Sequence, residues 1–284
     1  MLSYRHEGLG DMHIYLNGEW VPEEEATVPF QDRGFQLGES LFETVRVNNA
    51  VPFRVAKHMD RLKSGMETIQ LKSESVFDSI PVLVEEYINR NSINNALVRI
   101  MLTRGRAESL EPSIYISSRD IPHVESWPVK VMFMEERDYP ILRFHPAIKS
   151  GNYLGNMLAK RDATEAGAFE PVFVNEEGYV TECAIRNIFF IRNNTLLTPT
   201  VELGVLPGVM RDTIMELASR IGMEVEEGYI RAERVDDMDE AFISSTGVDV
   251  LPVFWDGFQS RYEKSMELRE ALEDLFESGA NDVS

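Results

Sequence analysis

The sequence predicts an α+β protein of two domains, and three observations support this. Apolar stretches typical of strands alternate with amphipathic stretches typical of helices, without the strict strand–helix–strand rhythm of a parallel fold. The length of 284 residues exceeds one average domain. The stretch 119–128 has two prolines and no clear period, so we expect it to join a first domain, 12–122, to a second, 123–284, with a mixed, barrel-like sheet. Residues 1–11 are polar and are interpreted as an extension.

Two hairpins, two helices and a further strand are predicted in the first domain. Asn17-Gly18 between short apolar runs is typical of a two-residue hairpin turn. Apolar residues recur every three or four positions over 55–70, as on one face of a helix. Pro81 must lie in the first turn of the next helix or kink it. The predicted elements, in order, are a hairpin over 13–20, a hairpin over 41–53, helices over 55–70 and 75–91, and a strand over 97–103.

Strands outnumber helices in the second domain. The predicted elements, in order, are a strand over 129–134, a helix over 154–167, strands over 171–175, 179–182, 187–192 and 195–198, a helix over 210–221, strands over 240–244 and 249–254, and a helix over 263–277. Turns at Glu177-Gly178 and Asn193-Asn194 separate the four consecutive strands, so we expect these strands to form a meander. Gly279 marks the end of the last helix.

Composition and charge argue against several classes of function. Lys and Arg total 28 against 48 Asp and Glu, and the net charge of −20 repels a phosphate backbone, so we expect no nucleic-acid partner. No apolar run approaches the roughly 18 residues of a membrane span, and the N-terminal stretch lacks the apolar core of a signal peptide. We therefore expect a cytoplasmic protein without a membrane partner.

The standard catalytic motifs are missing from the sequence. It has no dinucleotide-binding GxGxxG, no P-loop, no HExxH and no GxSxG, and its five histidines lack metal-ligand spacing, so we expect no metal. Cys183, the single cysteine, excludes an internal disulfide. It stands beside Glu182 and could be a nucleophile, but without a nearby histidine a small buried residue is the simpler interpretation.

An ordered set of short motifs resembles one enzyme family over about 240 of the 284 residues. The segment 148–160 is similar to the lysine segment of the fold type IV aminotransferases, which depend on pyridoxal 5′-phosphate. That family includes branched-chain aminotransferases, D-amino-acid aminotransferases and aminodeoxychorismate lyase. The other matching motifs are Asn17-Gly18, Asp32-Arg33-Gly34, His58–Leu62, Thr103–Gly105, Gly178–Glu182, Asn187–Phe189, Leu206–Gly208, Arg211-Asp212, Asp239-Glu240, Ser245-Thr246 and Pro252-Val253. The implied fold is a small α/β domain followed by a larger pseudo-barrel domain, and the implied assembly is a homodimer with active sites near the subunit interface.

The resemblance implies a role for each of three residues. Lys149, expected on a short strand, matches the lysine whose amine binds the cofactor aldehyde and then moves the proton from the substrate α-carbon. Glu182 matches the carboxylate that pairs with the pyridine nitrogen and keeps it protonated. Tyr153 matches a tyrosine near the phenolic oxygen of the cofactor, and a core aromatic residue is the alternative.

The resemblance also implies which residues bind the cofactor phosphate. Arg61 matches the phosphate-binding arginine, whose planar fork suits a dianion, although the helix pattern also allows a solvent-facing position. Ser245, Thr246 and Gly247 are expected to offer hydroxyl and N–H groups to the phosphate or to the substrate carboxylate.

The turn 206–210 is expected to complete the phosphate site. Gly208 lets the backbone approach the anion, and the N–H groups of Val209 and Met210 point at it from a helix start. Leu206 is expected to pack on the face of the cofactor ring. Most aminotransferases of the family carry threonine where Met210 stands, so one hydroxyl contact is lost here.

Different residues of this sequence resemble different members of the family. Phe42 and Arg99 agree with the branched-chain enzymes as substrate residues, although Arg99 in an apolar strand faces either a protein carboxylate or an open pocket. The string 148–160 is closest to the D-amino-acid type, but the Arg-x-His carboxylate trap of that type is missing. The run Thr181-Glu182-Cys183 and Met210 resemble the lyase, but the lyase usually has a threonine where Glu43 stands and lacks the Gly-Asn-Tyr that follows Lys149 here. We therefore predict an aminotransferase for branched-chain or other L-amino acids with glutamate as shuttle, and D-amino-acid transamination and the lyase reaction are the alternatives.

Overall fold

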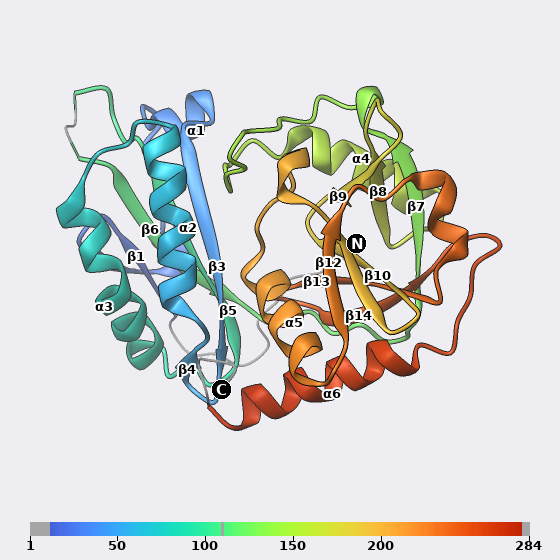
Figure 1. Cartoon of the computed structure of the whole chain (residues 1–284). Helices are drawn as coiled ribbons and strands as arrows, with labels where there is room; N and C mark the ends of the chain where they lie inside the picture. The colour runs from blue at the N-terminus through green and yellow to red at the C-terminus, as the bar shows by residue number, and fades with distance from the viewer. Residues whose placement is uncertain (1–11, 109–110, 280–284) are drawn as a thin grey trace. The chain divides into compact units, whose positions relative to one another are not determined.

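The computed structural model divides into two units, each with its own sheet (Figure 1). It describes residues 12–108 and 111–279. Unit 1 takes in the chain up to Pro122 together with Ile148–Asn152, and unit 2 takes in His123–Ala147 and the chain from Tyr153 onward. The short segment 148–152, which the sequence assigns to the second domain, thus packs with unit 1. Whether the units are domains that fold independently stays a prediction.

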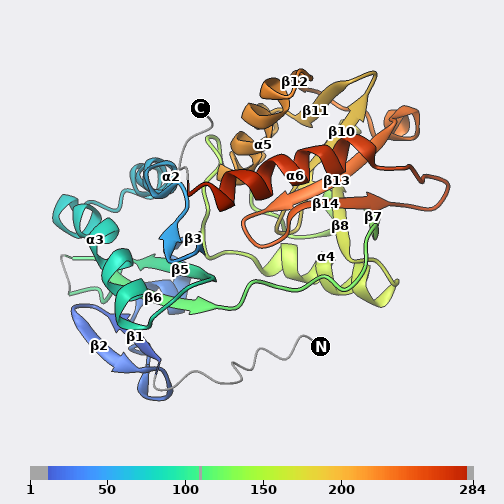
Figure 2. The ribbon, with the colours of Figure 1, turned by 90° about the horizontal axis from the view of Figure 1, so that it is seen from below.

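Unit 1 is an antiparallel sheet with two long helices on one face (Figures 1 and 2). Its strand order is β2-β1-β6-β5-β3-β4. The elements are β1 (His13–Leu16), β2 (Glu19–Pro22), α1 (Arg33–Leu37), β3 (Ser40–Asn48), β4 (Val51–Pro52), α2 (Val55–Thr68), α3 (Glu74–Arg90), β5 (Ala96–Thr103) and β6 (Ser113–Arg119). The hairpin predicted at Asn17-Gly18 is confirmed, because both residues have positive φ, at 48° and 99°, and Leu16 pairs with Glu19.

Unit 2 is an eight-stranded mixed sheet in the order β12-β11-β10-β13-β14-β7-β8-β9. The pairs β11–β12, β14–β7 and β7–β8 are parallel and the others are antiparallel. The strands are β7 (Val129–Glu135), β8 (Glu170–Val174), β9 (Val180–Cys183), β10 (Asn187–Arg192), β11 (Thr195–Pro199), β12 (Glu224–Gly228), β13 (Glu240–Ser245) and β14 (Asp249–Phe254).

Three helices cover the sheet of unit 2. They are α4 (Leu154–Glu165), α5 (Val209–Arg220) and α6 (Glu263–Glu277). Helices α5 and α6 pack on each other and on the strands β12 to β14, whereas α4 packs on β7 and β8 (Figure 2). Buried apolar residues of this sheet, such as Val131, Ile188 and Val253, form one continuous hydrophobic core. Across the described parts of the chain, no helix has the length and apolar character needed to span a membrane.

Most predicted elements are present, and the departures have physical causes. The four strands from β8 to β11 form no meander, because β9 pairs with β8 at one edge while β10 lies between β11 and β13. Helix α3 begins at Glu74, so Pro81 lies in its interior rather than in its first turn. The short helix α1 and the strands β6 and β12 were not predicted. Strand β12, for example, is mostly exposed and offers little apolar alternation.

A buried carboxylate from the sheet caps the last helix. Tyr262, the residue before α6, offers no side-chain cap. Glu240 of β13 does so instead: one oxygen accepts from the Lys264 N–H at 2.9 Å, and the other accepts from the N–H and hydroxyl of Ser265 at 2.7 and 2.6 Å. A negative charge at a helix N-terminus also interacts favourably with the helix dipole. Glu240 therefore joins α6 to the central strands of unit 2.

We predict that Glu240→Gln lowers the free energy of unfolding by about 1.5–3 kcal/mol, because charge-assisted hydrogen bonds to buried donors are lost. Urea denaturation followed by circular dichroism measures the change. Glu270→Gln on the same helix is the matched control, since Glu270 is exposed and lies beyond the first turn; its effect is expected to stay within about 0.5 kcal/mol. Equal losses in both variants would contradict the capping role.

Candidate active site

Main-chain hydrogen bonds to β3 hold Lys149 in unit 1. The Phe42 N–H donates to the Lys149 carbonyl at 2.9 Å, and the Gly151 N–H donates to the Ser40 carbonyl at 2.9 Å. Leu41 and Ser150 form a single antiparallel bridge, so Lys149 lies beside an isolated bridge rather than on the short strand that was expected. The main chain that carries the Lys149 side chain is therefore fixed on both sides.

Three of the predicted residues meet around one aromatic ring in unit 1. The Lys149 Nζ lies 4.4 Å from the centre of the Phe42 ring, and the Arg99 guanidinium carbon lies 4.0 Å from it. The antiparallel register explains this, because Phe42 faces Met101 and Thr44 faces Arg99 across β3 and β5, with one residue between them on each strand. The structure therefore brings together an amine, a guanidinium and a buried aromatic surface.

Arg61, by contrast, binds a carboxylate that the sequence interpretation had not placed in the site. Glu43 of β3 is completely buried and accepts from Arg61 Nε at 2.8 Å and from Arg61 Nη2 at 2.5 Å. The same carboxylate lies 2.7 Å from Nδ1 of the buried His58. A charged residue within the apolar run 41–47 was the signal that could have identified Glu43.

The buried group of Glu43, Arg61 and His58 contains one negative and one positive charge. Burial alone would raise the pKa of Glu43, but Arg61 and His58 outweigh burial and lower that pKa to about 2. Burial lowers the pKa of His58 despite the opposing effect of Glu43, so the imidazole is mainly neutral at pH 7. Glu43 and Arg61 therefore form an ion pair in which His58 is a neutral partner.

In unit 2, Arg143 holds the carboxylate of Glu182. One Glu182 oxygen forms a close ion pair with Arg143 Nη1, and the other accepts from the Leu206 N–H at 3.2 Å. Arg143 also forms a close pair with Glu136 and donates to Thr181 Oγ1 at 3.1 Å. The carboxylate of Glu182 is thus oriented from two sides, and Leu206 and Glu182, both predicted, are brought together.

The turn before α5 has the features of an anion site. Gly208 is the N-cap of this helix, and a Cβ there would overlap the side-chain oxygen of Asn187. The Asn187 amide donates to the Leu206 carbonyl at 2.9 Å and fixes the turn. Val209 and Met210 form the first turn of α5 and are buried. The N–H groups of a helix's first turn have no partner within the helix, which suits them to an anion.

The end of β13 adjoins the same asparagine. Asn187 pairs with Ser244 across β10 and β13, and the Ser244 hydroxyl is buried without a hydrogen-bond partner among the described residues. The Ser245 hydroxyl accepts from the Gly247 N–H at 3.3 Å in the turn that carries Thr246. Tyr153 is placed in unit 2 as the N-cap of α4. The roles of Ser245, Thr246, Gly247 and Tyr153 stay predictions.

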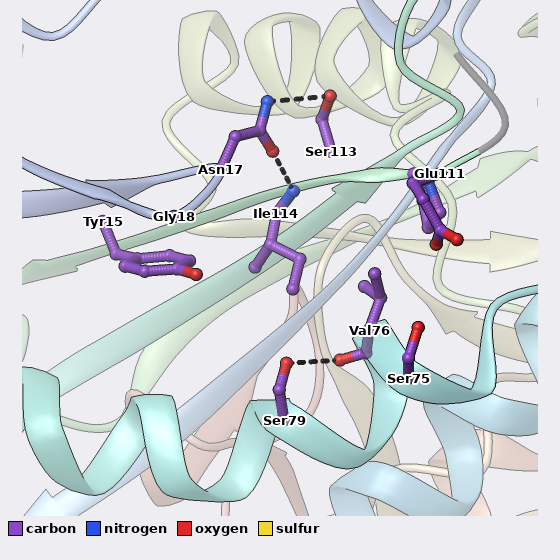
Figure 3. Close-up of a pocket in the computed structure, with 10 residues that line it drawn as sticks. Tyr15, Asn17, Gly18, Ser75, Val76, Ser79, Glu111, Ser113 and Ile114 are labelled. Carbon is purple, nitrogen blue, oxygen red and sulfur yellow. Dashed lines mark hydrogen bonds between the residues drawn. The ribbon is translucent and has the colours of Figure 1, made fainter.

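Two other features do not contribute to the site. Burial raises the pKa of the Cys183 thiol, which is 1% exposed, so the simpler interpretation of a small buried residue fits its surroundings. A cavity of about 430 Å³ in unit 1 is lined by Tyr15, Asn17, Ser79 and Ser113, among others (Figure 3). Asn17 and Ser79 bond to neighbouring protein groups there, and no predicted site residue lines the cavity. Within 12–108 and 111–279, no group of three His, Cys, Asp or Glu residues could hold a metal ion.

A family model and the curated relatives described here all identify this chain as similar to aminotransferases. The family model for amino-transferase class IV matches residues 40–254. A protein of Methanocaldococcus jannaschii named "Putative branched-chain-amino-acid aminotransferase" is 32% identical over 278 residues, which cover 93% of this chain and 95% of that protein. A D-alanine aminotransferase of Listeria monocytogenes is 33% identical over 257 residues, which cover 85% and 86%.

The fold is also found among solved structures. A branched-chain amino acid aminotransferase from Escherichia coli superposes with a TM-score of 0.84 at 26% identity, over 96% of this chain and 97% of that one. This likeness confirms the predicted fold class, with a smaller α/β part and a larger part built on a curled mixed sheet.

We predict that Arg143→Gln lowers the melting temperature by about 5–10 °C, because two carboxylates, Glu136 and Glu182, lose the cation between them at a cost of about 3 kcal/mol. Differential scanning calorimetry measures the shift. Arg137→Gln is the control, since the Arg137 side chain is 63% exposed and lies 4.0 Å from Glu135. If both variants melt within a degree of the wild type, Arg143 has no such role.

Proposed function

We propose that this chain, which belongs to the class IV aminotransferase family, transfers an amino group between a branched-chain or other L-amino acid and a 2-oxo acid, with glutamate as the common shuttle. Family members use pyridoxal 5′-phosphate and act on amino acids and 2-oxo acids. The observation that carries the choice of substrate is the contact of both Lys149 and Arg99 with the Phe42 ring. The homodimer expected from the family resemblance is part of the proposal.

The residues present fit this cofactor. Unit 1 offers an amine and a guanidinium. Unit 2 offers an oriented carboxylate, a helix start whose N-cap Gly208 has no side chain, and the buried Ser244 hydroxyl, for which the described residues provide no hydrogen-bond partner. In our proposal, the aldehyde is bound by Lys149, the pyridine nitrogen by Glu182 and the ring face by Leu206. When bound, the cofactor supplies an electron sink for the charge released at the substrate α-carbon. The phosphate would be held by Arg61, by the N–H groups of Val209 and Met210, and by Ser245 and Thr246, with Tyr153 near the phenolic oxygen.

Lys149 has two tasks in the proposed reaction. Its amine would hold the cofactor through its aldehyde, and when free of the cofactor it would carry the proton that leaves the substrate α-carbon. Both tasks require an amine in a defined place. The main-chain bonds between β3 and residues 149–151 fix the point from which the Lys149 side chain extends, and the Phe42 ring lies against Nζ on one side.

Glu182 keeps a negative charge in place for the pyridine nitrogen. An ionised carboxylate accepts up to about four hydrogen bonds, so the bonds from Arg143 and the Leu206 N–H leave acceptor capacity for a protonated ring nitrogen. Arg143 places a positive charge directly beside the Glu182 carboxylate, which is largely buried. Arg143 is therefore a positioning residue, one that the sequence interpretation did not identify.

Arg99 and its surroundings support an L-amino-acid substrate with either an apolar or an acidic side chain. The Phe42 ring gives apolar surface for a branched side chain, and the Arg99 guanidinium beside it can pair with the side-chain carboxylate of glutamate. Arg104, in the loop that follows β5, forms a close pair with Glu39 and donates to the Ile69 carbonyl at 2.5 Å. These bonds occupy Arg104 in packing, which disfavours a D-type carboxylate trap.

The lyase alternative is disfavoured by Glu43. The resemblance described above places threonine at this position in the lyase, whereas here a buried glutamate pairs with Arg61 and His58. A panel of L- and D-amino acids with 2-oxoglutarate or pyruvate as acceptor tests the proposed function directly. Transamination of L-leucine and L-glutamate supports it, whereas activity with D-alanine alone contradicts it.

We predict that the purified protein is yellow and that Lys149→Ala loses both the colour and all turnover, because the covalent attachment and the proton carrier disappear together. Visible absorption spectra and single-turnover assays measure the two effects. Lys63→Ala, on the exposed side of α2, is the control and should keep both. A wild-type protein that stays colourless after addition of pyridoxal 5′-phosphate contradicts the whole proposal.

For Arg99→Ala we expect glutamate turnover to fall by about ten- to a hundredfold, the size of one lost charge-assisted pair of about 1.5–3 kcal/mol. Turnover of leucine should change much less, because it depends on apolar contact. The measured quantity is the ratio of kcat/KM for glutamate and for leucine in the amino-donating half-reaction. If both values fall together and the variant melts many degrees lower, Arg99 is a structural charge and does not select the substrate.

A further inference from the structure

Glu43 and Arg61 form a bidentate salt bridge. Arg61 Nε meets one oxygen of Glu43 at 2.8 Å, and Arg61 Nη2 meets the other at 2.5 Å. Two parallel bonds between a planar guanidinium and a planar carboxylate fix the plane of the arginine as well as its position. This salt bridge uses Nε and Nη2 of Arg61, and it therefore sets the direction in which the third nitrogen, Nη1, points.

His58 fixes the carboxylate in turn. Its Nδ1 lies 2.7 Å from the Glu43 oxygen that also accepts from Arg61 Nη2. Because the imidazole is mainly neutral, this contact requires the tautomer with hydrogen on Nδ1. His58 and Arg61 are three residues apart on α2 and therefore point to the same side of the helix. Glu43 thus accepts three hydrogen bonds from one helix face and cannot rotate without breaking them.

Strand β3 relates this group to Lys149. Phe42, the neighbour of Glu43, donates its N–H to the Lys149 carbonyl at 2.9 Å, and its ring contacts the Lys149 amine. Successive residues of a strand point to opposite faces, so Phe42 lies toward Lys149 and Glu43 toward α2. Two adjacent residues therefore set the positions of the amine and of the guanidinium, all within unit 1.

We propose that Glu43 is a positioning residue for cofactor binding: it holds the Arg61 guanidinium in the orientation that binds the phosphate and keeps that orientation in register with Lys149. This inference rests on the proposed role of Arg61 as a phosphate ligand. Arg61 is 10% exposed, and an arginine buried to this extent without an acidic partner would be costly. Glu43 balances its charge, and the cofactor phosphate then meets an arginine that has little side-chain freedom left to lose.

The test compares two probes that differ only in the phosphate. Dissociation constants of pyridoxal 5′-phosphate and of pyridoxal are measured by absorbance titration of the cofactor-free full-length protein. The discrimination ratio is the value for pyridoxal divided by that for pyridoxal 5′-phosphate. A role through the phosphate changes this ratio, whereas a merely structural role changes both constants alike.

Glu43→Gln is the principal variant. A glutamine side chain has one acceptor oxygen, so its amide NH2 group must face an N–H donor of Arg61 in either orientation. The bidentate salt bridge is therefore lost. We expect the ratio to fall about tenfold, with the pyridoxal constant within about twofold of wild type. Arg61→Gln should lower the ratio at least as much, and the double variant should lower it no further than Arg61→Gln alone. Glu39→Gln, which removes another glutamate bonded to two arginines in unit 1, is the matched control and should leave the ratio unchanged.

The outcomes separate this inference from the proposed function. If Arg61→Gln lowers the ratio and Glu43→Gln does not, the positioning role is wrong and the phosphate role of Arg61 stands. If Arg61→Gln leaves the ratio unchanged, the proposed phosphate site itself is wrong. Should Glu43→Gln fail to fold, Glu43→Asp takes its place: it keeps the charge but shortens the side chain by one methylene, and a ratio equal to wild type overturns the inference.

Discussion

The pairing of β3 with the segment 148–152 is the constraint on which the proposed site depends. Lys149 lies far from β3 in sequence, yet main-chain bonds from Phe42 and Gly151 attach its segment to that strand. Backbone hydrogen bonds of this kind fix the position of the main chain without using the lysine side chain. The segment consequently packs with unit 1, while the chain before and after it belongs to unit 2. The same strand carries Glu43 on its other face, so the position of β3 determines where both Lys149 and Glu43 lie.

Buried charge in this acidic protein follows a consistent rule. Most of its 48 carboxylates can remain solvated, but a few are buried, and each of these has specific partners. Glu43 meets an arginine and a histidine, Glu240 meets the first N–H groups of α6, and Glu170 meets Lys160, Arg186 and the Ile185 N–H. Glu182 differs in purpose, because its partners orient it and still leave acceptor capacity. The same kind of pairing thus holds Glu170 and Glu240 within the fold and, in our proposal, orients Glu182 for the cofactor.

Local patterns predicted local structure well, and long-range pairing poorly. Helix α6 has the predicted bounds, and the Asn17-Gly18 hairpin has the expected positive φ values, because both depend on neighbouring residues. The strands β9 and β10 were also found in sequence, but their separation in the sheet was not. The pairing of strands depends on how their apolar faces meet across the whole unit. The sequence of a single apolar strand does not identify the strand with which it pairs.

The same division applies to the proposed site. The sequence alone determined the residue types and their order: a lysine, an arginine on an amphipathic helix, a glutamate at a strand end and a glycine turn before a helix, which together indicated the family. Only the tertiary structure identified Glu43 with His58 and Arg143 with Glu136 as the groups that hold Arg61 and Glu182. The physical reason is that a charged side chain is positioned by its nearest counter-charge, and these partners come from other strands, helices or loops whose proximity only folding creates.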